Sequence, residues 1–273
     1  MTILVTGATG NVGRHLVRQL ADAGHKVRAL TRDASKARLP EGVEVVTGDL
    51  TDIAGLAPAF DGVEAVHLIN FGGNDYGLLD NGAELVELAV KSGVKRVTML
   101  TGWERGSLDA AVEASPLAWT RLMPGEFMSN TLEWAEPIIR DGRIEQPFGG
   151  GYSPLTHEAD LASVALVALT TDGHGGQTYK VNGAEVLTKY ERLRILGEAT
   201  GRELEFVDLT PAEATERWKA AHLPDETIAF LLRVFGDLPT DPYPLESDVE
   251  RVTGKPPRRF AQWAAEHAPR FRA

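Results

Sequence analysis

Residues 2–13 read TILVTGATGNVG, and this stretch decides the fold of the chain. Its apolar run, residues 3–5, is too short for a helix and predicts a buried strand. Gly7, Gly10 and Gly13 follow at a spacing of three residues, and the apolar residues after them recur with helical period. A strand, a glycine turn and a helix in this order place main-chain N–H groups around a pyrophosphate.

Each of the three glycines has a separate expected role in such a turn. Gly7 makes the tight turn, Gly10 lets a phosphate approach the backbone, and Gly13 lets the helix pack close to the strand. The alternative is a structural turn without a ligand. Three spaced glycines argue against that alternative, because each is costly in chain entropy and none has an obvious packing need.

Composition and charge narrow the class of protein. The chain has 273 residues, 43% hydrophobic and 25% charged, which is ordinary for one large globular domain or a main domain with a smaller lobe. A formal net charge of -11 without a basic tract argues against nucleic acid as a partner. No apolar stretch has the length of a membrane span, and a first strand at residue 2 leaves no room for a signal peptide. We therefore expect a cytoplasmic protein without membrane contact.

The residue types also exclude some chemistry. The chain has no cysteine, so it forms no disulfide and carries no thiol nucleophile. No histidine cluster has the spacing of metal ligands, so we expect no metal site. A small molecule is the expected partner, and the oligomeric state stays open between monomer and homodimer.

Strands and helices alternate along most of the chain. After the glycine turn, strands are predicted at residues 27–30, 43–46, 65–70, 97–100 and 119–123. Helical segments separate them, among them residues 78–92 and 108–114, and a helix over 158–169 with a strand over 177–181 completes the series. This alternation predicts an α/β fold with a doubly wound parallel Rossmann sheet.

The regular alternation breaks twice, which predicts a second lobe. We expect residues 1–125, completed by residues 156–183, to form the dinucleotide-binding core. Residues 126–155 and 184–273 then form a small, mostly helical substrate lobe. Thr188 with Glu191 and Thr210 with Glu213 both fit a capping box at a helix start.

Five short motifs give the chain a family resemblance. They are TGATGNVG at 6–13, VRALTRD at 27–33, GDL at 48–50, SGVKRV at 92–97 and PGEFMSN at 124–130. Together they resemble the NmrA-like, atypical short-chain dehydrogenases/reductases. The resemblance implies a Rossmann core, a bound nicotinamide dinucleotide and a small substrate lobe. It leaves the reaction open, because this family holds quinone and ketone reductases as well as redox-sensing regulators.

The end of the second strand indicates which cofactor is bound. NAD-preferring sites place an acidic residue there for the ribose 2′-hydroxyl. This chain has Arg32, with Lys36 four residues on, and a guanidinium suits a 2′-phosphate. We therefore predict NADP(H). The alternative is a solvated surface pair, and Asp33 between them would weaken the phosphate preference.

The resemblance also implies further cofactor contacts. In the glycine turn these are Thr9, Asn11 and Val12. Asp49 and Leu50 would flank the adenine, and Thr101 and Pro124 would also contact the cofactor. Asn70 and Phe71, at the tip of the fourth strand, should line the nicotinamide-side ribose, although Asn70 equally fits an ordinary strand-end turn.

The expected reaction machinery departs from that of the wider superfamily. Most short-chain dehydrogenases use a Tyr followed four residues later by Lys, and none of the five tyrosines here has that lysine. Thr101 lies near the position of the superfamily's catalytic Ser or Thr. Thr101 and Asn70 are therefore our candidate catalytic residues, with water or a substrate hydroxyl as further ways to neutralise an oxyanion.

Aromatic residues near the predicted lobe are candidates for substrate contact. We expect Trp103, Phe127, Met128 and Trp134 to line an aromatic site, although cover of the sheet's apolar edge explains them equally. His157 could face the cleft, or simply start a helix. The sequence thus favours an NADPH-dependent reductase of a carbonyl or quinone-like, aromatic or polycyclic molecule. The alternatives are a catalytically silent NADP(H)-sensing regulator and a non-redox isomerase or dehydratase that retains its cofactor.

Overall fold

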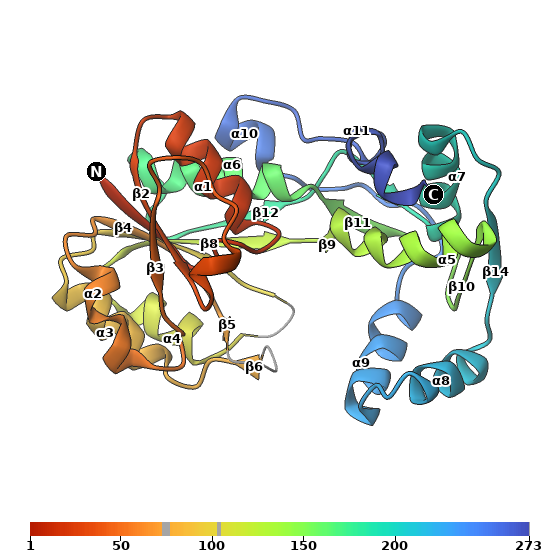
Figure 1. Ribbon diagram of the computed structural model, residues 1–273, viewed down its shortest axis with the longest axis horizontal. Helices are drawn as coiled ribbons and strands as arrows, with labels where there is room; N and C mark the ends of the chain where they lie inside the picture. Colours follow the sequence, from red (N-terminus) through yellow and green to blue (C-terminus); the bar gives the residue numbers. More distant parts are fainter. Residues whose placement is uncertain (73–76, 103–104, 273) are drawn as a thin grey trace. The chain divides into compact units, whose positions relative to one another are not determined.

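The computed structural model describes residues 1–72, 77–102 and 105–272, and their contacts form two compact units (Figure 1). Unit 1 comprises Met1–Pro124, Glu158–Val181 and Ser247–Lys255, and unit 2 comprises Gly125–His157, Asn182–Glu246 and Pro256–Ala273. The boundaries expected from the sequence lie close to most of these breaks. One segment differs, because residues 247–255 were assigned to the smaller lobe and pack in unit 1 instead.

Unit 1 is built on a seven-stranded sheet in which every neighbouring pair is parallel. The strand order is β12-β8-β7-β4-β1-β2-β3. The strands are β1 (Thr2–Val5), β2 (Lys26–Thr31), β3 (Glu44–Thr47), β4 (Ala65–Ile69), β7 (Arg96–Leu100), β8 (Ala118–Pro124) and β12 (Gln177–Val181). The order reverses between β1 and β4, which is the switch point where such sheets bind ligands. The predicted doubly wound fold is confirmed.

Helices cover both faces of this sheet (Figure 1). On one face α1 (Gly13–Asp22) contacts α6 (Glu158–Thr170), and α10 (Val249–Thr253) packs on α6. On the other face α2 (Ile53–Phe60), α3 (Gly82–Lys91) and α4 (Ser107–Ala114) pack in series. The short elements are η1 (Ala34–Lys36) and the antiparallel pair β5 (Phe71–Gly72) and β6 (Gly77–Leu78).

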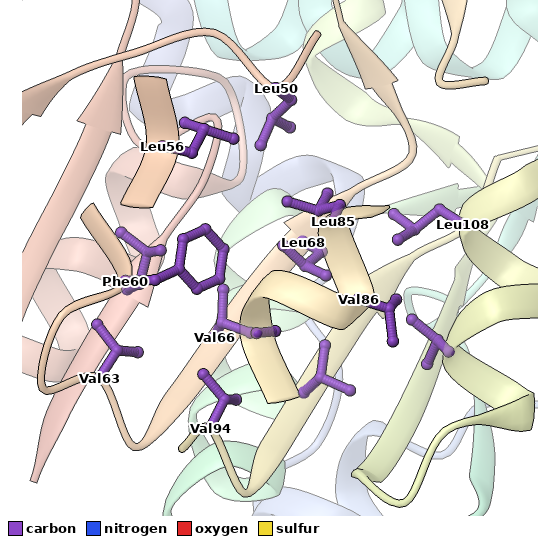
Figure 2. Packing of buried hydrophobic residues seen from close by; sticks show 14 of the residues in the cluster. Leu50, Leu56, Phe60, Val63, Val66, Leu68, Leu85, Val86, Val94 and Leu108 are labelled. Atoms are coloured by element: carbon purple, nitrogen blue, oxygen red, sulfur yellow. The ribbon is translucent and has the colours of Figure 1, made fainter. Parts of the chain in front are cut away.

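One apolar core of unit 1 lies between the sheet and the helices α2, α3 and α4. Figure 2 shows Val66 and Leu68 of β4 surrounded by side chains from these helices: Leu56, Phe60, Leu85, Val86 and Leu108. Burying each such side chain contributes about 1.5–3 kcal/mol before conformational entropy is counted. Because both faces are covered, the central strands read as continuous apolar runs, as in residues 3–5.

Helix α3 begins later than the sequence indicated. We expected a helix over 78–92, but Leu78 lies in β6 and α3 starts at Gly82. The main-chain N–H of Gly82 donates to Ser107 Oγ at 3.0 Å, and a Cβ at residue 82 would lie 2.2 Å from Leu108 N. The start of α3 is therefore set by its contact with α4, which leucine periodicity does not report.

Unit 2 has short strands at its start and helices over most of its length. Its elements are β9 (Glu126–Phe127), η2 (Met128–Trp134), α5 (Ala135–Asp141), β10 (Arg143–Gln146), β11 (Ser153–Thr156), β13 (Val186–Leu187), α7 (Lys189–Thr200), β14 (Glu205–Asp208), α8 (Pro211–Ala220), α9 (Asp225–Gly236), α11 (Phe260–His267) and η3 (Ala268–Phe271). An apolar cluster that includes Ile138, Leu193, Phe260 and Trp263 forms its own core. Both predicted capping boxes are present, at the starts of α7 and α8.

Residues 1–72, 77–102 and 105–272 give two findings on membranes and metals. None of the helices in this part of the chain is both long enough and apolar enough to span a membrane. Across the same residues, no group of three or more His, Cys, Asp or Glu side chains is placed to hold a metal ion.

Candidate dinucleotide and active site

The glycine turn after β1 has the geometry that its spacing predicts. Gly7 has a φ of +58°, in the left-handed region that favours glycine, and its carbonyl accepts the N–H of Gly10 at 2.9 Å. A Cβ at Gly13 would lie 2.1 Å from Gly7 O and 2.8 Å from Ala8 Cα. The first turn of α1 therefore lies against the end of β1 at a distance that only glycine permits.

The start of α1 is suited to an anion. The first main-chain N–H groups of a helix have no partner within the helix and carry the positive end of its dipole. Val12 caps α1 without a side-chain hydrogen bond, and the first turn holds no acidic residue. Thr9 and Asn11 are exposed in the turn. These features fit a dinucleotide pyrophosphate, which would lie against the N–H groups of the turn.

The switch point beside this turn is held together by one buried hydroxyl. Thr6 is fully buried, its Oγ1 donates to His67 O at 2.9 Å, and it accepts the N–H of Ile69 at 3.1 Å. It thereby links β1 and β4 at the point where the strand order reverses. The carboxyl ends of the parallel strands lie along one edge of the sheet, so the residues after β1, β2, β3, β4, β7 and β8 share that edge.

Arg32 follows β2 at this edge and is exposed. The neighbouring Asp33 accepts Ser35 N at 3.0 Å and Ser35 Oγ at 2.6 Å, and lies 2.9 Å from Lys36 Nζ. The Ser35 and Lys36 hydrogen bonds lower the pKa of Asp33 to about 2. The Asp33 carboxylate, which would compete with a 2′-phosphate for Arg32, is thus engaged by Ser35 and Lys36 in its own turn. Lys36 shares that ion pair, and both Arg32 and Lys36 stay candidates for the phosphate.

The residues predicted to contact adenine and ribose have different exposures. Asp49 follows β3, and its Oδ1 accepts the main-chain N–H of Thr51 at 3.0 Å, which stabilises the turn there. Leu50 is 5% exposed and its side chain belongs to the core of unit 1. Phe71 in β5 and Pro124 at the end of β8 are half-buried. Their contacts with a dinucleotide stay predictions.

Asn70 and Thr101, the candidate catalytic residues, both contact a third residue that the sequence reasoning missed. They follow β4 and β7 and are 2% and 3% exposed. Thr101 Oγ1 donates to Asp109 Oδ1 at 2.9 Å, and Asn70 Nδ2 lies 3.5 Å from Asp109 Oδ2. The sequence signal of Asp109 was only an acid in the first turn of a predicted helix, a position that the helix dipole favours in any case.

Three of the described tyrosines have a raised pKa, whereas the acid of a short-chain dehydrogenase requires a lowered one. Burial raises the pKa of Tyr179 and of Tyr243. The hydroxyl of Tyr190 donates to Asp208 at 2.5 Å, and this bond raises its pKa to about 12. Tyr152 is half-buried in unit 2, and Tyr76 lies outside the described residues. The pKa shifts agree with the missing lysines in the sequence.

The expected substrate residues belong to unit 2, apart from Trp103, which lies outside the described residues. Met128 and Trp134 are 0% and 4% exposed and pack in the core of unit 2. His157 is 1% exposed, and its Nε2 lies 3.4 Å from Glu266 Oε2. Phe127 is half-buried in β9. These positions give Met128, Trp134 and His157 a packing role within unit 2, and contact with a substrate stays a prediction.

The fold and the edge site define a dinucleotide-binding protein of the Rossmann type. Residues 7–172, more than half of the chain, match the NAD(P)H-binding family, and the chain belongs to it. The chain is 34% identical to the NAD(P)H azoreductase of Xenophilus azovorans, with 99% of both chains covered. It is 36% identical to the (4-alkanoyl-5-oxo-2,5-dihydrofuran-3-yl)methyl phosphate reductase of Streptomyces griseus, covering 98% of this chain and 99% of that one.

A solved structure shows the same fold. The NADPH-dependent quinone oxidoreductase of Escherichia coli, in complex with NADPH, superposes with a TM-score of 0.79 at 22% identity, covering 97% of this chain and 99% of that one. The family match confirms the expected NAD(P)H cofactor. A solved structure of NmrA has the same fold, with a TM-score of 0.73 at 19% identity. The protein is an NAD(P)H-dependent oxidoreductase.

Proposed function

We propose that this oxidoreductase prefers NADPH and reduces conjugated acceptors: quinones, conjugated aromatic or polycyclic ketones and related compounds. The observation that carries this proposal is the hydrogen bond from Thr101 Oγ1 to Asp109 Oδ1. A hydroxyl has one proton to donate, and the proton of Thr101 is already directed to the carboxylate. Thr101 is therefore poorly placed to donate a hydrogen bond to an oxyanion of a substrate.

The missing proton donor limits which substrates are reduced efficiently. Hydride addition to an isolated ketone leaves a localised alkoxide, and a positioned general acid usually speeds such a step by about 10²–10⁴-fold. When hydride adds at the far end of a conjugated acceptor, the negative charge spreads over the remaining π system, so protonation by water suffices. The chain has no Tyr-x-x-x-Lys pair. A site without that pair favours acceptors that stabilise their own charge.

The names of the relatives support the same class of substrate. An azo group is an N=N double bond, and a 4-alkanoyl-5-oxo-2,5-dihydrofuran holds a C=C bond conjugated to two carbonyl groups. The quinone substrate of the structural neighbour is conjugated as well. These substrates belong to those proteins, and their common chemistry is what we propose for this chain.

The roles of the chain's own residues follow from their places in unit 1. The turn at residues 7–13 binds the pyrophosphate through its main-chain N–H groups, and Arg32 binds the 2′-phosphate. When bound, the dinucleotide supplies a hydride at its nicotinamide ring. Because Asp33 is engaged by Ser35 and Lys36, its carboxylate is held in its own turn and offers less competition for Arg32.

A panel of acceptors tests the proposal. NADPH oxidation is followed by absorbance with a naphthoquinone, a polycyclic ketone, an azo dye and cyclohexanone. We expect at least one conjugated acceptor to be reduced at least a hundredfold faster than cyclohexanone. Equal rates with cyclohexanone would refute the proposal, and so would tight NADPH binding without oxidation by any of the acceptors.

A further inference from the structure

Asp109 is a fully buried carboxylate that connects three separate parts of the active-site edge. Besides Thr101 and Asn70, its Oδ2 accepts the main-chain N–H of Gly106 at 2.9 Å. Its exposed fraction is 0%. The carboxyl ends of β4 and β7 and the start of α4 are therefore joined through one side chain.

The charge of this carboxylate is balanced inside unit 1. Arg121 on β8 is 8% exposed, and its Nε lies 3.8 Å from Asp109 Oδ1, an ion contact beyond hydrogen-bond distance. The same guanidinium pairs with Glu113 on α4, and Arg105 pairs with Glu113 as well. Buried ion pairs often add little stability compared with apolar residues of the same size. Stability alone is therefore a weak reason for a carboxylate at this position, and orientation of its neighbours is a stronger one.

The hydrogen bonds to Asp109 determine which atoms of Thr101 and Asn70 act as donors and which stay acceptors. Thr101 donates its single proton to Asp109 and keeps its lone pairs for other groups. The amide of Asn70 must likewise turn its nitrogen towards Asp109, which places Oδ1 on the opposite side of the amide. Without the carboxylate, either side chain could reverse and present a donor.

We propose that Asp109 is a positioning residue that makes Thr101 and Asn70 hydrogen-bond acceptors for the carboxamide N–H groups of NAD(P)H. The proposal rests on the proposed function and on the expectation from the sequence that the nicotinamide side of the cofactor lies at the tip of β4, beside Asn70. It assigns Thr101 to cofactor recognition instead of oxyanion stabilisation. It makes no demand on the identity of the substrate.

The test compares two ligands that differ in the nicotinamide. Calorimetry measures dissociation constants of NADPH and of 2′-phospho-ADP-ribose, which lacks the nicotinamide ring, for the parent and for Asp109→Asn, Thr101→Val and the double variant. Loss of one or two hydrogen bonds is expected to weaken NADPH about tenfold. Binding of 2′-phospho-ADP-ribose should stay within about twofold. Because Asp109 acts partly through Thr101, the double variant should weaken NADPH by less than the two single losses combined.

Glu113→Gln is the matched control. Glu113 lies on α4 like Asp109, and the substitution breaks its ion pair with Arg121 but leaves the hydrogen bond between Asp109 and Thr101. It should leave both affinities within about twofold. Should Asp109→Asn not fold, the same selective loss in Thr101→Val still carries the test. Unchanged NADPH affinity in Thr101→Val and Asp109→Asn, or equal losses for both ligands, would overturn the proposal. If the variants weaken NADPH selectively while the parent protein reduces none of the acceptors, that result would support the role of Asp109 and reject the proposed function.

Discussion

Replacing Gly13 with Ala should damage both folding and cofactor binding, because the new methyl group meets backbone. Its Cβ would lie 2.1 Å from Gly7 O and 2.8 Å from Ala8 Cα. Ordinary contact needs about 3.5 Å, so α1 would have to move away from β1 by an ångström or more. Overpacking typically costs about 1–3 kcal/mol, and two rigid backbone atoms place this case near the upper value.

The loss should be visible in thermal unfolding and in NADPH titration. For a unit of this size, about 3 kcal/mol corresponds to a fall in Tm of roughly 6–12 °C. Gly175→Ala is the control, because its Cβ would meet Ala118 Cβ at 3.4 Å, an ordinary contact. Gly10→Val separates folding from binding: the nearest atom to a Cβ there is Gly7 O at 3.1 Å, so the variant should fold and fail to bind NADPH. Parent-like Tm and affinity in Gly13→Ala would refute the role we give to the turn.

Three further predictions use other parts of the chain. Arg32→Ala should weaken NADPH about ten- to a hundredfold, from a loss of about 1.5–3 kcal/mol, and leave NADH nearly unchanged; equal losses in calorimetry would remove Arg32 from the 2′-phosphate. Each of the five Tyr→Phe variants should stay within about tenfold of the parent in single-turnover NADPH oxidation, whereas a thousandfold loss at any of them would identify a general acid. Burial lowers the pKa of His67 from 6.5 to about 4, so the unfolded state binds more protons between those values. The free energy of unfolding should therefore fall by about 1.4 kcal/mol per pH unit as the pH drops through that window, and urea curves of His67→Leu should lack this slope if His67 causes it.

The geometry of the glycine turn and the position of Arg32 could be predicted from the sequence because their signals are local. Gly7, Gly10 and Gly13 act through backbone geometry within one turn, and Arg32 is placed by the strand that precedes it. The strand alternation likewise predicted the sheet, since each strand covered on both faces must be apolar along its length.

The rest depends on contacts between segments that are distant in sequence. Helix α3 starts at Gly82 because it meets α4 there, and Leu78 fits the helical period by coincidence. Residues 247–255 pack on α6 although they follow a long stretch of unit 2. Asp109 looks like any acid in a first helical turn until the fold brings Thr101 and Asn70 to it.

Hydride transfer from NADPH to a conjugated acceptor is the central claim, and one single-turnover experiment tests it directly. Protein preloaded with NADPH, or with NADPH deuterated at the nicotinamide C4, is mixed rapidly with a naphthoquinone, and absorbance of the reduced nicotinamide is followed. We expect complete oxidation of the bound NADPH, and a slower reaction with deuterium in the transferred position. Gly10→Val, which should not bind NADPH, should show no oxidation. Bound NADPH that stays reduced in the presence of the quinone would contradict the central claim.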